Sequence, residues 1–97
     1  MPMIHLEYED QVAVLKLNRG IINAINLQLV NELAETLQTV KRDADVHSLV
    51  LGSANDKFFS IGFDIPQLFE LTEDDFRVFY QAFNRACMHL YTLPKPT

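Results

Sequence analysis

Two short apolar runs separated by one amphipathic stretch restrict this chain to a mixed α/β fold. Val12 to Leu17 is almost entirely apolar, and Ser48 to Gly52 is a second apolar run that ends in glycine. Between them, the spacing predicts a helix that Asn26 caps and that ends at Lys41 and Arg42. Its apolar stripe consists of Leu29, Val30, Leu33, Leu37 and Val40. This order predicts two parallel strands joined by a right-handed crossover helix.

The flanking segments extend this unit. Ile4 to Glu9 alternates between apolar and polar residues, which predicts a strand that forms an antiparallel hairpin with Val12 to Leu17. Asp64 to Phe69 has the pattern of a brief helix capped by Asp64. Thr72 begins a longer helix that ends before Pro94. Its predicted apolar stripe is Phe76, Phe79, Tyr80, Phe83, Cys87 and Leu90.

The predicted sheet is small for a fold of this kind. A parallel pair of apolar strands usually has both faces covered and further strands beside it, whereas this sequence supplies three strands at most. We therefore expect residues 1–97 to be one N-terminal portion of a larger domain, truncated at Thr97. The alternative is that another copy covers the open sheet edge.

Composition excludes several classes of function. Apolar residues make up 48% of the 97 residues, which indicates a folded chain. The net charge is −5 and the basic residues are scattered, so neither nucleic acid nor a membrane surface is an expected partner. No apolar run is long enough for membrane insertion. A single cysteine excludes an internal disulfide, and the N-terminus lacks a signal-peptide pattern, so we expect a cytoplasmic protein.

A glycine in the segment FFSIGFDI is the strongest local feature. Gly62 lies in a loop that runs from the strand ending at Gly52 to the short helix at Asp64. Open α/β sheets bind ligands at this end of their strands, and amides before a helix lack partners. The amides of Ile61 and Gly62 are therefore candidate donors to an anion or oxyanion. A simple turn glycine explains the same pattern.

Four segments together resemble the enoyl-CoA hydratase/isomerase (crotonase) family. They are NAINLQLVNEL from Asn23, SLVLGS from Ser48, FFSIGFDI from Phe58 and LPKPT from Leu93. The family patterns are roughly N-A-[LM]-[ND] for the first and F-[SC]-A-G-x-D-[IL] for the third. The four segments occur in the family's order and at about its spacing, and the resemblance extends over essentially the whole chain. It implies a partial ClpP/crotonase-like unit with a hairpin, crossover helix, parallel strand and long C-terminal helix.

The resemblance implies a site for an acyl-CoA thioester, with no cofactor other than the coenzyme A of the substrate. The backbone N–H of Ile61, before Gly62, would be the first oxyanion donor to a thioester enolate. Phe63 would lie beside the acyl group, and Asp64 would cap a helix. Ile22, Asn23 and Ala24 would bind CoA, because they belong to the segment that lies along the nucleotide and pantetheine of CoA in relatives. Pro66 replaces a basic residue that often contacts phosphate there.

The resemblance also implies what this chain lacks. In the family, the second oxyanion donor and the carboxylates for proton transfer come after the segment that matches LPKPT, so we expect residues 1–97 alone to be inactive. Relatives form trimers and hexamers, so a homo-oligomer is expected. Two alternatives remain open: a non-catalytic self-associating or adaptor protein of the same fold, and an anion-binding module unrelated to CoA.

Other reactive residue types have ordinary explanations. His5, His47 and His89 are too dispersed for a local metal motif, so no metal site is predicted. Cys87 falls on a predicted apolar stripe and is expected to be a small core residue. Ser60 has no histidine pattern nearby that would make it a nucleophile. The acids at 73–75 fit the first turn of a helix.

Overall fold

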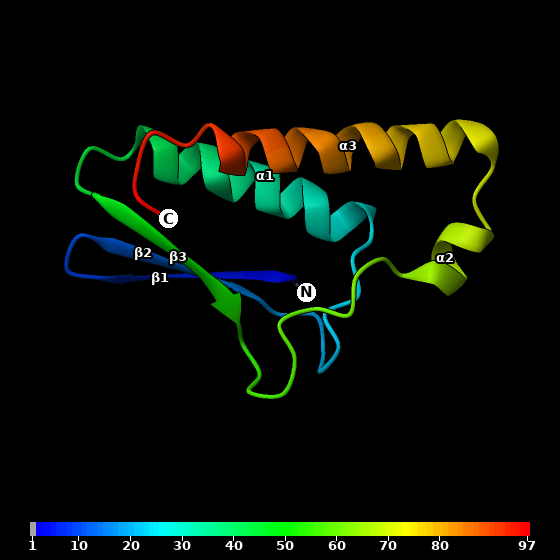
Figure 1. Cartoon of the computed structure of the whole chain (residues 1–97), viewed down its shortest axis with the longest axis horizontal. Coiled ribbons are helices and arrows are strands. Elements are labelled where there is room, and N and C mark those ends of the chain that lie inside the picture. The colour runs from blue at the N-terminus through cyan, green and yellow to red at the C-terminus, as the bar shows by residue number, and fades with distance from the viewer. Residues whose placement is uncertain (1) are drawn as a thin grey trace.

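The computed structural model describes residues 2–97 and has a three-stranded sheet with helices over one face (Figure 1). Its elements are β1 (Ile4–Glu9), β2 (Val12–Leu17), α1 (Leu27–Arg42), β3 (Ser48–Ser53), α2 (Ile65–Phe69) and α3 (Glu73–Tyr91). The sheet order is β1-β2-β3, with β1 antiparallel and β3 parallel to β2. The predicted hairpin, the strand–helix–strand unit and the long C-terminal helix are therefore confirmed.

The alternation of side chains gives the sheet one covered face and one open face. Ala13, Leu15 and Leu17 of β2 are buried and belong to the apolar cluster that includes α1. Val14, which points to the opposite face, pairs with Val50 of β3, and Val50 is 51% exposed. The helices thus cover only the face that carries the odd-numbered residues of β2.

Two apolar clusters join the layers. The first joins the sheet to α1, and its buried members are Ile4, Ala13, Leu15, Leu17, Leu29, Leu37, Val40, Val46, Leu49 and Leu93. The second joins α1 to α3 through Val30, Phe79, Ala82 and Ala86. The apolar stripe predicted for α1 therefore serves both clusters, with Val30 facing α3 and its neighbour Leu29 facing the sheet.

The buried face of α3 differs from the predicted stripe. Phe79 is buried as expected, but Phe76 and Tyr80 are 44% and 51% exposed, and Cys87 is exposed rather than a core residue. Ala82 and Ala86 occupy the inward positions instead. Small side chains let α3 approach α1 closely, and a pattern based on large apolar residues overlooks them.

The C-terminal segment returns to the sheet beside β3. The N–H of Leu49 donates to the carbonyl of Pro96 at 2.9 Å. The ammonium of Lys95 donates to the carbonyls of Val40 and Asp43 at 2.6 and 2.7 Å, so it satisfies acceptors at the end of α1. Lys95 thereby ties the last residues of the chain to the crossover helix.

Asn26 caps α1, and its replacement tests how much this cap stabilises the protein. Its side-chain oxygen accepts the N–H of Leu29 at 2.9 Å, and Asn26 is only 7% exposed. We expect Asn26→Ala to lower the free energy of unfolding by about 1 kcal/mol, measured by urea denaturation. Thr72→Ala serves as the comparison, because it removes the exposed cap of α3, in which the Thr72 hydroxyl accepts the N–H of Asp75 at 3.1 Å. An Asn26 variant as stable as the parent would contradict this assignment.

Candidate functional site

Two loops meet at the carboxyl ends of the parallel strands β2 and β3. Residues 18–26 follow β2 and residues 54–64 follow β3, so both loops leave the same edge of the sheet. Ile25 and Phe63 form an isolated parallel bridge between them. The N–H of Ile25 donates to Gly62 at 2.8 Å, and the N–H of Asp64 donates to Ile25 at 2.9 Å. The bridge brings the two sequence segments predicted to form the site into contact.

Asn23 is the buried centre of this loop pair. Its side chain is fully enclosed, accepts the N–H of Arg19 at 2.7 Å, and donates to Ser53 Oγ at 2.8 Å and the Phe59 carbonyl at 2.9 Å. Its backbone has φ of 48°, a left-handed conformation that asparagine tolerates better than most residues. All polar atoms of the side chain are thus engaged within the protein, so Asn23 holds the loops together and its amide offers no free group to CoA.

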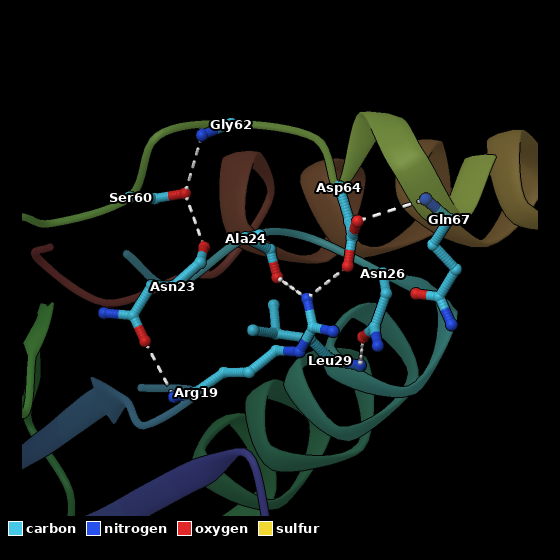
Figure 2. A network of polar contacts seen from close by, with 9 residues as sticks. All are labelled: Arg19, Asn23, Ala24, Asn26, Leu29, Ser60, Gly62, Asp64 and Gln67. Carbon is cyan, nitrogen blue, oxygen red and sulfur yellow. Dashed lines mark hydrogen bonds and ion pairs between the residues drawn. The ribbon is translucent and has the colours of Figure 1, made fainter. Parts of the chain in front are cut away.

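Ser60 connects the same two loops. Its hydroxyl donates to the Asn23 carbonyl at 2.8 Å and accepts the N–H of Gly62 at 3.0 Å (Figure 2). Gly62 has φ of +96°, which lets the chain turn sharply between that contact and the bridge. Ser60 therefore joins the Asn23 backbone to the glycine turn.

The structure distinguishes the loop amides, which the sequence could not do. The N–H of Ile61 donates to the Ile22 carbonyl at 3.0 Å, that of Gly62 to Ser60, and that of Asp64 to Ile25. Within residues 2–97, the N–H of Phe63 has no hydrogen-bond partner. Ile61, the predicted oxyanion donor, could reach a ligand only by giving up its bond to Ile22. Phe63 supplies the amide that is already available.

The direction of the Phe63 amide follows from the bridge. In a trans peptide, the N–H points opposite to the carbonyl of the preceding residue. The Gly62 carbonyl points at Ile25, where it accepts a hydrogen bond at 2.8 Å. The N–H of Phe63 therefore points away from Ile25, to the outer side of the loop.

The ring of Phe63 is fixed against α3. It meets Phe79 and Phe83 edge-on, with centroid separations of 5.5 and 4.9 Å. Such edge-to-face pairs each stabilise by about 0.5–1.5 kcal/mol beyond the area that they bury. The aromatic cluster on α3 thus restricts the residue whose amide is unpaired.

A cleft of about 530 Å³ opens beside these loops. It is lined by Arg19, Gly20, Ile22, Ala24, Ile61, Phe63, Asp64, Ile65 and Pro66. Ile22 and Ile61 are 45% and 55% exposed on its rim. Five of the seven predicted site residues are among these lining residues, and the other two, Asn23 and Gly62, are not.

An ion pair joins the two loops at the cleft. Arg19 Nη1 lies 2.9 Å from Asp64 Oδ2 and 2.7 Å from the Ala24 carbonyl. Asp64 also caps α2 as predicted, because its Oδ1 accepts the N–H of Gln67 at 3.2 Å. Hydrogen bonds from Arg19 and then from Gln67 lower the pKa of Asp64 below its ordinary value. The carboxylate therefore stays ionised near neutral pH and is unsuited to donate a proton.

This pKa shift predicts how stability depends on acid. Because the pKa of Asp64 is lower in the folded state, its contribution is present above the unfolded-state value of about 3.9 and is lost as pH falls through the folded-state value. We expect Asp64→Asn to flatten the fall in the free energy of unfolding below about pH 4. Urea denaturation from pH 2 to 7 measures this. Arg19→Met should remove the same acid dependence, and an unchanged slope in both variants would contradict the assignment.

Arg19 and Ser60 are the residues whose importance the sequence did not reveal. Arg19 belongs to the segment expected to lie along CoA, but no sequence pattern indicated that it pairs with Asp64. Ser60 was considered only as a nucleophile. A usable signal was present in the topology, because residues after two parallel strands gather at one edge of the sheet.

The described part of the chain contains neither a metal cluster nor a membrane span. Among residues 2–97, no three His, Cys, Asp or Glu side chains lie close enough to hold a metal ion. Over the same residues, no helix combines the length and the apolar character that crossing a bilayer requires.

A parallel strand, a glycine turn and an outward amide before a helix define an α/β unit with a candidate oxyanion loop. Residues 7–97 match the family model described as Enoyl-CoA hydratase/isomerase, so this chain belongs to the enoyl-CoA hydratase/isomerase family. It is 32% identical over 92 residues to the short-chain-enoyl-CoA hydratase of Clostridium acetobutylicum, covering 94% of this chain and 35% of that protein.

Other relatives agree with this assignment. The chain is 21% identical over 89 residues to the mitochondrial enoyl-CoA delta isomerase 1 of Rattus norvegicus, covering 92% of this chain and 31% of that protein. A solved enoyl-CoA hydratase/carnithine racemase from Magnetospirillum magneticum superposes with a TM-score of 0.91 at 29% identity, covering 99% of this chain and 37% of that one. The fold is therefore that of crotonase-type proteins, and the chain spans about a third of the length of these curated relatives.

Proposed function

We propose that the cleft beside the two loops binds an acyl-CoA thioester, whose carbonyl oxygen accepts the N–H of Phe63. The unpaired Phe63 amide is the observation that carries this proposal. A donor fixed before the reaction stabilises the negative charge that develops on the oxygen when an enolate forms. Membership of the enoyl-CoA hydratase/isomerase family supports a thioester as the ligand. The donor is thus proposed one residue after Gly62, rather than one residue before it at Ile61.

The proposed placement of CoA follows the cleft lining. Ile22 and Ile61 present apolar side chains on the rim, which suits the pantetheine arm. The backbone from Arg19 to Ala24, with Asn23 holding it in place, would run beside the nucleotide end. Pro66, in the first turn of α2, stands where relatives often have a basic residue, so no charge from that position would contact phosphate. Coenzyme A enters as part of the substrate, and no further cofactor is proposed.

We propose that the reaction itself is of the hydratase or isomerase type in a protein that also supplies a second donor and proton-transfer groups. Within residues 2–97, Asp64 is the carboxylate next to the unpaired amide, and its ion pair with Arg19 makes it a poor acid or base. Loss of one oxyanion donor typically costs roughly 10²–10³ in rate. The 97-residue chain alone is therefore expected to bind a thioester without turning it over.

Three related ligands test this proposal by ¹⁵N NMR titration. Butyryl-CoA carries the thioester carbonyl, S-butyl-CoA is a thioether that lacks it, and CoA lacks the acyl chain. We expect all three to shift amides of residues 19–24, and only butyryl-CoA to move the Phe63 amide proton downfield. A Phe63 shift that is equal for butyryl-CoA and S-butyl-CoA would contradict the carbonyl contact. Inorganic phosphate binding in preference to CoA would favour an anion-binding module instead.

The exposed apolar surface supports a second candidate function, which is self-association without catalysis. Phe69 of α2 and Tyr91 of α3 are 88% and 86% exposed, and Val50, on the open face of the sheet, is 51% exposed. Large exposed apolar areas are typical of protein–protein interfaces. Sedimentation equilibrium of the ligand-free chain tests this candidate. A concentration-independent monomer would contradict it.

A further inference from the structure

We infer that Arg19 is a positioning residue, whose guanidinium fixes the peptide that carries the Phe63 amide. This inference rests on the function proposed above, because it concerns the group that would meet the thioester. It is carried by contacts that link Arg19 to both sides of the Ile25–Phe63 bridge.

Arg19 crosses the bridge next to the residues that form it. Its Nη1 contacts the carbonyl of Ala24 at 2.7 Å and Oδ2 of Asp64 at 2.9 Å (Figure 2). Ala24 directly precedes Ile25, and Asp64 directly follows Phe63. One nitrogen therefore joins the two bridging segments at adjacent positions, in parallel with the backbone hydrogen bonds of the bridge.

The backbone of Arg19 is fixed as well. Its N–H donates to the Asn23 side chain at 2.7 Å, and its carbonyl accepts the N–H of Asn23 at 3.2 Å. The side chain of Arg19 is 27% exposed and that of Asp64 is 17% exposed, so water screens their attraction only in part. A charge-assisted contact that starts from a fixed backbone holds its partner more tightly than a neutral one.

Asp64 passes this restraint to the unpaired amide. Its N–H donates to Ile25 at 2.9 Å and its second carboxylate oxygen accepts the N–H of Gln67 at 3.2 Å. The Gly62 carbonyl, on the other side of Phe63, is held by Ile25 at 2.8 Å. Rotation of the Gly62–Phe63 peptide would break the hydrogen bond between the Gly62 carbonyl and Ile25. Such a rotation requires the two loops to separate at the bridge. Arg19 opposes that separation because it contacts both loops.

Hydrogen exchange on the ligand-free chain tests the restraint directly. In Arg19→Met, which keeps the aliphatic stem, we expect the amides of Ile25 and Asp64 to exchange at least tenfold faster than in the parent, relative to core amides of β2. Arg77→Met is the matched control, because it removes an arginine from an exposed ion pair with Glu73 on α3 at 3.3 Å. Arg19→Lys, which keeps the charge, should restore part of the protection.

The same variants separate this inference from the proposed function. With butyryl-CoA, Arg19→Met should lose the downfield Phe63 shift and bind about tenfold more weakly, while Arg77→Met behaves like the parent. Unchanged protection of Ile25 and Asp64 in Arg19→Met would overturn the inference. If the parent shows no Phe63 response, the proposed function fails, and exchange alone decides whether Arg19 fixes the peptide. If Arg19→Met does not fold, Asp64→Asn, which keeps an oxygen to cap α2, replaces it in both measurements.

Discussion

Gly62→Val is expected to abolish the hydrogen bond between the Phe63 amide and the thioester carbonyl of butyryl-CoA. Gly62 has φ of +96°, a conformation that costs a residue with a side chain about 1–3 kcal/mol and a β-branched residue more. A Cβ built at this position meets no atom within 4 Å, so the cost arises from the backbone and not from a clash. The loop can relieve it only by rotating the peptides on either side of Gly62, and one of these carries the Phe63 N–H.

Titration with butyryl-CoA measures the effect of Gly62→Val on affinity. We expect the affinity for butyryl-CoA to fall about tenfold to a hundredfold, which corresponds to about 1.4–2.8 kcal/mol. Gly52→Ala is the matched control, because Gly52 also has open space around a built Cβ but has no positive φ. Equal affinities of the two variants would contradict a role for the Gly62 conformation. In a longer protein with turnover, Gly62→Val should remove that turnover.

The features that the sequence predicted correctly depend on short-range patterns. The bounds of β1, β2 and α1 follow from periodicities of two and about 3.6 residues. The caps Asn26, Asp64 and Thr72 each act on an amide three residues later, so their signals lie within a few positions. The burial of α3 was predicted less well, because the face that turns inward is set by how closely two helices approach. Cys87 was misplaced for that reason.

The donor in the loop could not be chosen from the sequence. Whether Ile61 or Phe63 has a free N–H depends on the Ile22 carbonyl and on the bridge at Ile25, which belong to the other loop. The N–H of Gly62 is taken by the Ser60 hydroxyl of its own loop, which in turn donates to the Asn23 carbonyl of the other loop. A resemblance places the loop but does not orient each peptide within it. The pairing of Arg19 with Asp64 also becomes visible only when the parallel strands bring both loops to one edge.

Asn23 is the residue on which the whole site depends most, and its replacement should have the largest effect on stability. Asn23→Ala removes three part-buried hydrogen bonds, and it leaves the Arg19 N–H and the Phe59 carbonyl without this partner. Ser53 Oγ still accepts the N–H of Asn55 at 3.1 Å. Each unsatisfied group costs about 1–3 kcal/mol, and the φ of 48° adds strain for alanine. We expect the free energy of unfolding to fall by about 3–5 kcal/mol, a large part of the total for a small domain.

Two further variants separate the causes of that loss. Asn23→Gly removes the same hydrogen bonds but tolerates the positive φ, so it should be about 1 kcal/mol more stable than Asn23→Ala in urea denaturation. Asn84→Ala, on the exposed surface of α3, should change stability by less than about 0.5 kcal/mol. An Asn23→Ala chain as stable as the Asn84 variant would mean that the two loops hold together without this amide. The position of the Phe63 amide would then rest on Arg19, the Ile25–Phe63 bridge and the contacts of the Phe63 ring with α3, so Arg19→Met should loosen the loops more than Asn23→Ala does.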